Sequence, residues 1–96
     1  MLTTGNQLRA ARALVDLGQT ELATLAGVNI NTIGAMEKRG ALTLSSGLET
    51  IRSVMKVLED RGIEFLNHGR PGVRLREQTG AKATIGPDDL NASNDK

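Results

Sequence analysis

The sequence predicts one mainly α-helical domain, residues 1–76, with four helices and a C-terminal β-hairpin. In four segments separated by glycines, apolar residues recur every three or four positions, which is the spacing of amphipathic helices. After Gly62 the spacing changes to two, with apolar and charged residues alternating on both sides of a turn-rich segment. A chain of 96 residues has room for one core of this kind.

The first two helices are predicted over residues 5–16 and 19–26. Thr4 and Gln7 have the spacing of a capping box at the start of the first helix. Gly27 ends the second, because glycine readily adopts the left-handed conformation of a helix C-terminus. The apolar positions of the two helices are Leu8, Ala11, Leu14, Val15, Leu22, Ala23, Leu25 and Ala26.

The next two helices are predicted over residues 30–38 and 46–61. Asn29 is a good N-cap for the third helix, and Ser46 with Glu49 forms a second capping box. The apolar positions are Ile30, Ile33, Met36, Leu48, Ile51, Val54, Met55 and Leu58. The stripe of the fourth helix exceeds what one face needs, so we expect part of it to serve a dimer.

A β-hairpin is predicted from residue 63 to residue 76. Ile63-Glu64-Phe65 and Val73-Arg74-Leu75-Arg76 alternate apolar and charged residues, and the segment 67–72 between them is dense in turn formers. The edge strand of such a hairpin can pair with a second copy of the chain.

The composition limits the chemistry that the chain can perform. It has no Cys and one His, His68, so we expect no disulfide, no metal site and no cofactor. No paired carboxylates, no nucleophile beside a base and no phosphate-binding loop are visible, so we expect no catalytic residue and no enzyme activity. No segment approaches the roughly 20 apolar residues of a membrane-crossing helix, and we expect a cytoplasmic protein without membrane contact.

The net charge of +1 is unevenly distributed. Residues 1–76 carry ten Lys and Arg against seven Asp and Glu, a net charge of +3, whereas residues 77–96 carry two against four, a net charge of −2. The predicted domain is therefore mildly basic, which permits binding to nucleic acid. Residues 77–96 have too few apolar side chains for a packed element and are predicted to be a disordered tail.

The short connection between the second and third helices requires a steep crossing. Ala23 supplies a small residue where the backbones meet, Gly27 can adopt positive φ, and Val28 and Ile33 fill the wedge. The pattern Gln19, Leu22-Ala23, Gly27-Val28 and Ile33 closely resembles the helix-turn-helix of the Cro and phage-repressor family, often called XRE-type. The resemblance covers roughly residues 6–61, four of the family's usual five helices, and implies a repressor-like DNA-binding domain.

The resemblance implies that the third helix enters the major groove of double-stranded DNA. The residues expected to face base edges are Asn29, Ile30, Asn31, Thr32 and Ala35. Asn31 can bind adenine through two hydrogen bonds, Thr32 can contact a thymine methyl group and Ile30 can make only apolar contact, so half-sites containing A and T are expected. Gln19 is expected at a phosphate, and Lys38 and Arg39 at the DNA backbone, although a solvated helix end would also carry these two charges.

The resemblance also implies a structural pair between Arg12 and Glu37, with Arg12 facing the phosphates as well. Leu48 and Ile51 match a packing pair of the family. The hairpin looks like an extension found on some bacterial members. Its arginines are expected either to contact DNA as a wing or simply to form a charged outer face. They are Arg70, Arg74 and Arg76.

These expectations favour a transcriptional regulator, more specifically a repressor that binds a pseudo-palindromic operator as a homodimer. The alternative is a protein-interaction module on the same scaffold, such as an antiactivator or an antitoxin. Ile30, Gly34 and Ala35 motivate this alternative, because many relatives carry Arg, Gln or Ser near the start of this helix.

Overall fold

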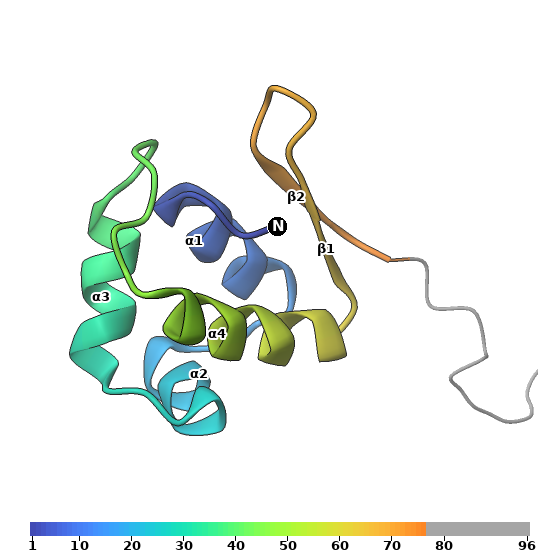
Figure 1. Cartoon of the computed structure of the whole chain (residues 1–96). Coiled ribbons are helices and arrows are strands. Elements are labelled where there is room, and N and C mark those ends of the chain that lie inside the picture. The colour runs from blue at the N-terminus through green and yellow to red at the C-terminus, as the bar shows by residue number, and fades with distance from the viewer. Residues whose placement is uncertain (77–96) are drawn as a thin grey trace, which may run out of the picture.

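The computed structural model describes residues 1–76 as four helices followed by a two-stranded antiparallel hairpin (Figure 1). The elements are α1 (Gly5–Leu14), α2 (Gln19–Ala26), α3 (Ile30–Lys38), α4 (Leu48–Asp60), β1 (Ile63–Leu66) and β2 (Gly72–Leu75). The predicted class, mainly α-helical with a C-terminal hairpin, is confirmed. The tail predicted for residues 77–96 lies outside the described residues. None of the helices in residues 1–76 has the length and apolar character that crossing a membrane requires.

The start of α1 is the predicted capping box. The Thr4 hydroxyl accepts the Gln7 backbone N–H at 3.2 Å, and the Gln7 side-chain oxygen accepts the Thr4 N–H at 3.1 Å. The helix ends at Leu14, two residues before the predicted end, because the chain turns at Asp16, which has a positive φ of 54°. Leu14, the last residue of the helix, is exposed rather than part of the core.

The predicted start of α4 is wrong. Gly47, not Ser46, is the N-cap, and no side chain caps this helix. The helix begins at Leu48, whose side chain has 55% of its surface exposed, so only Ile51 of the expected Leu48–Ile51 packing pair belongs to the core. Leu44, from the preceding linker, is buried in the core instead.

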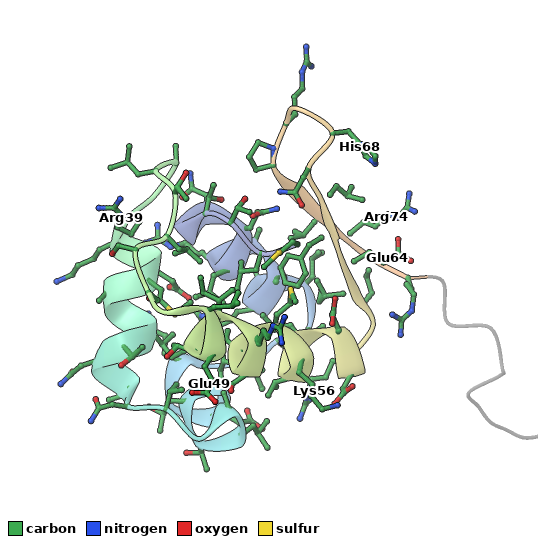
Figure 2. The ribbon with its side chains drawn as sticks, viewed as in Figure 1. Arg39, Glu49, Lys56, Glu64, His68 and Arg74 are labelled. Atoms are coloured by element: carbon green, nitrogen blue, oxygen red, sulfur yellow. The ribbon has the colours of Figure 1, made fainter. Side chains whose placement is uncertain are left out.

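One apolar core joins the helices to the hairpin. Its buried members are Leu2, Leu8, Ala11, Leu17, Leu22, Ala23, Ile33, Met36, Leu44, Ile51, Val54, Leu58 and Ile63. The stripe of α4 is therefore used within this chain, apart from Leu48. Glu49 and Lys56 are exposed along α4 (Figure 2). The expected apolar surplus on α4 for a dimer is thus reduced to one leucine.

The hairpin packs against α1 and α4, while α3 lies on the opposite side of the molecule (Figure 1). Ile63 is paired with Leu75, and Phe65 with Val73. On the other face of the sheet Arg74 forms an ion pair with Glu64, with Nε and Oε1 2.6 Å apart (Figure 2).

Gln7 fastens the hairpin to the start of α1. Its side chain is almost fully buried, with 2% of the residue exposed. Besides accepting the backbone N–H groups of Thr3 and Thr4, it donates through Nε2 to the carbonyl oxygens of Leu66 at 3.2 Å and Gly72 at 3.1 Å. One amide thus serves both as a helix cap and as the link between the first and last elements of the fold.

Gln7→Glu should lower the free energy of unfolding by about 2–3 kcal/mol, because a carboxylate would face two carbonyl oxygens that now accept hydrogen bonds. A side-chain oxygen that accepts the backbone N–H groups of Thr3 and Thr4 would remain. We expect hairpin amides to lose protection from hydrogen exchange more than amides of α2. Equal loss in both elements would contradict a specific link to the hairpin.

Candidate nucleic-acid interface

A three-residue turn sets α3 at a steep angle to α2 (Figure 1). Gly27 has a φ of 71°, and the N–H of Val28 donates to the carbonyl of Ala23 at 3.0 Å, which closes the C-terminus of α2. The Asn29 side-chain oxygen accepts the Asn31 N–H at 2.7 Å and so caps α3. The turn thus supplies hydrogen bonds to backbone groups at both helix ends, through Val28 for α2 and through Asn29 for α3.

Three side chains of α3 are buried, Ile33, Met36 and Glu37, and they fix the side that faces the core. The opposite side lies along the outer surface of the molecule (Figure 1). Exposed residues of α3 are Ile30, Asn31, Ala35 and Lys38. At helical spacing these positions share one side of the helix and form a continuous exposed surface.

The structure brings together most of the residues expected to face base edges. Ile30, Asn31 and Ala35 are exposed on the same side of α3, whereas Thr32 is only half-exposed. The oxygen of the Asn29 side chain is occupied by the cap, which leaves its NH₂ group as the donor for any contact with DNA. Asn31 is therefore the best placed hydrogen-bonding side chain of this set.

The C-terminal end of α3 carries two exposed cations. Lys38 is the last helical residue, and Arg39 follows as the C-cap. Arg39 Nε donates to the carbonyl of Thr43 at 2.9 Å, so this arginine also holds the loop that follows α3. The two charges lie at the end of the exposed surface that is far from Asn31.

Arg12 and Glu37 form an ion pair between α1 and α3. Arg12 Nε and Glu37 Oε2 are 2.5 Å apart, and Arg12 Nη2 donates to Glu37 Oε1 at 3.0 Å, a bidentate arrangement. Gln19 Nε2 donates to the same Oε1 at 3.0 Å. The Glu37 side chain is 3% exposed, so this cluster joins three helices in the interior.

The electrostatics of this cluster keep Glu37 ionised. Burial raises the pKa of the Glu37 carboxyl, but the hydrogen bonds from Arg12 and Gln19 and the charges of Arg12 and Arg9 outweigh it and hold the pKa below its ordinary value. The hydrogen bond to Glu37 raises the pKa of Arg12, against the opposing effect of burial. The acid of α3 is thereby neutralised internally.

Two expected phosphate contacts are altered by this cluster. Arg12 directs Nε and Nη2 to Glu37 and Nη1 to the carbonyl of Leu17 at 2.9 Å, so its guanidinium is used within the chain rather than directed at phosphates. Gln19 is half-buried, and its side-chain amide already donates one hydrogen bond to Glu37. A phosphate contact would therefore have to use the second hydrogen of that amide.

Arg9 was not among the residues predicted from the sequence to lie at this surface. Its side chain is 61% exposed, and its Nε lies 3.7 Å from Glu37 Oε1. Arg9 and Arg12 are three residues apart on one helix and thus share a face, which was the available signal. Arg9 adds an exposed cation close to α3.

Arg74 of the hairpin lies away from α3. Arg74 and His68 lie on the side of the molecule away from Arg39 (Figure 2). For Arg74, this placement favours a charged outer face over a wing that reaches the same DNA segment as α3 (Figure 2). Arg74 is in any case paired with Glu64.

Within residues 1–76, no three His, Cys, Asp or Glu side chains gather where they could hold a metal ion. No family model and no curated protein sequence matches this chain.

Proposed function

We propose that this protein is a sequence-specific DNA-binding transcriptional regulator of the cytoplasm without enzyme activity of its own. In this proposal α2 and α3 form a helix-turn-helix, and α3 enters the major groove with Asn31 and Ile30 toward the bases. Lys38, Arg39 and Arg9 neutralise phosphates beside the groove. The protein acts as a repressor by occupying an operator.

The exposed side of α3 is the observation that carries this proposal. Its core side is fully packed, and its single acid, Glu37, is buried and paired, so the outer side combines an amide, apolar groups and cations without an exposed carboxylate. Such a surface suits a polyanion whose grooves display hydrogen-bonding edges. A carboxylate on this side would have repelled phosphates.

The operator in this proposal is pseudo-palindromic and the regulator is a homodimer. Two copies related by a two-fold axis place their recognition helices about 34 Å apart, one turn of DNA. The hairpin lies on the opposite side of the molecule from α3 (Figure 1), so pairing of two hairpin edges would hold the recognition helices too far apart, and the dimer of this proposal does not use that edge.

Asn31→Ala should weaken binding of the operator about tenfold per half-site, because one bidentate contact to adenine contributes about 1–3 kcal/mol. Thr32→Ala should have a smaller effect, since Thr32 is half-exposed. The DNA is first enriched from a random pool by the full chain at physiological salt, and affinities are then measured by fluorescence anisotropy. Thr24→Ala, an exposed position of α2, serves as the control and should bind as the unmodified protein does.

A protein-interaction module on this scaffold is the second candidate function. Exposed leucines outside α3 favour it, since Leu25, Leu42 and Leu48 each have half or more of their surface exposed. An antiactivator or antitoxin of this kind would enrich no DNA from the random pool. In that case Asn31→Ala would change nothing in the binding assay, whereas the regulator predicts a clear loss.

A further inference from the structure

We infer that Ile30 sets the sequence preference of this protein by apolar contact with the C5-methyl group of thymine. The inference rests on the DNA-binding role proposed above. Ile30 begins α3 and has 42% of its surface exposed, whereas Ile33 and Met36 of the same helix are buried. Single exposed apolar residues are common on proteins, so exposure alone assigns no role.

The groups around Ile30 provide few hydrogen bonds for reading bases. The Asn29 oxygen is used by the cap, and Thr32 is half-buried. Asn31 remains as the exposed amide of the first turn. The first turn of α3 therefore presents one amide next to one branched apolar side chain.

Gly34 leaves the backbone of α3 open to close approach from outside this chain. A glycine in the middle of a helix lowers helix stability relative to alanine. A Cβ at Gly34 would meet nothing within 4 Å in this chain, so the packing of the fold does not require a glycine there. Because Gly34 has no side chain, the surface of a partner can come close to the helix backbone there and contact the neighbouring Ile30 side chain.

The charge of the surroundings favours duplex DNA as the partner. Lys38 and Arg39 follow along the exposed side, Arg9 lies nearby, and Glu37 is neutralised in the interior. Among the base edges in the major groove, the thymine methyl group is the apolar one. Ile30 cannot donate or accept a hydrogen bond, so this methyl group is the feature that it can recognise.

The test replaces thymine by deoxyuridine, which removes the methyl group and keeps every hydrogen-bonding group. The duplex enriched by the full chain is resynthesised with deoxyuridine at each half-site thymine in turn, first in one half-site and then in both. At the thymine that Ile30 contacts, we expect about fourfold weaker binding for one half-site and about 15-fold for both.

Two variants assign the effect to Ile30. Ile30→Ala should bind the thymine and deoxyuridine duplexes equally. Leu25→Ala removes a similarly exposed apolar side chain from α2 and should keep the full discrimination. Circular dichroism of both variants checks that the helices are retained.

The outcomes separate this inference from the proposed function. If the chain enriches no DNA, the DNA-binding role itself is overturned. If the chain binds a specific duplex but does not distinguish thymine from deoxyuridine, DNA binding stands and the role of Ile30 is overturned. The same conclusion follows if Ile30→Ala still distinguishes thymine from deoxyuridine. Enriched half-sites without thymine would also overturn it.

Discussion

Replacing Glu37 with Ala should lower the free energy of unfolding by about 3–5 kcal/mol, the range for removing one partner of a buried ion pair. The loss would leave the Arg12 guanidinium and the Gln19 amide without their shared acceptor between α1, α2 and α3. A fold of this size has a total stability of about 4–11 kcal/mol. We therefore expect a much lower midpoint in urea unfolding.

Two variants control this prediction. Glu37→Gln keeps the shape of the side chain and removes its charge, so the free energy of unfolding of this variant should lie between those of the parent and Glu37→Ala. Glu59→Ala removes an exposed acid of α4 and should change stability by no more than about 0.5 kcal/mol. Similar losses for Glu37→Ala and Glu59→Ala would contradict the structural role of the pair.

The same pair predicts how stability depends on pH. The pKa of Glu37 is lower in the folded than in the unfolded chain, so its contribution to stability is complete above the ordinary pKa of a glutamate carboxyl and is lost as the pH falls through the folded pKa. Unfolding measured between neutral pH and pH 3 should show this loss for the parent chain. Glu37→Gln should show a shallower decline, and an identical decline would rule out the assignment.

Gly5→Ala should destabilise the fold by about 3 kcal/mol, because the first turn of α1 lies directly against the end of α3. A Cβ at Gly5 would overlap the carbonyl oxygen of Met36 and lie 2.8 Å from that of Glu37 and 2.9 Å from the Gly40 amide nitrogen. All three atoms belong to the backbone, so relief requires the two helices to separate. The Asn6 N–H also donates to the Gly40 carbonyl at 2.9 Å, and this bond would be strained.

Gly34→Ala is the matched control, since both glycines are helical and only Gly5 lies against backbone. The added methyl group at Gly34 meets open space in this chain, so this variant should gain about 1 kcal/mol in stability. Thermal unfolding of both variants measures the two effects. If Gly5→Ala were as stable as Gly34→Ala, the close approach of α1 and α3 would be refuted.

The bounds of α2 and α3 could be predicted because local chemistry specifies them. Gly27 closes one helix through its positive φ, and Asn29 opens the next through its side-chain oxygen, and both effects involve only neighbouring residues. The bounds of α1 and α4 were less accurate. Ser46 and Glu49 have the spacing of a cap, but the core takes Leu44, and the helix starts later than local preference suggests.

The amino-acid order specified which segments are helical, where the period changes to a hairpin, and that Asn31 and Ile30 begin the third helix, because these properties depend on neighbours a few positions away. Long-range packing decided the rest. It placed Gly5 at the contact between α1 and the end of α3, and it brought the Gln7 side chain into hydrogen bonds with the hairpin. It also used the donors of Arg12 internally and set the hairpin opposite α3. Each of these depends on backbone atoms that are distant in sequence and meet only after folding.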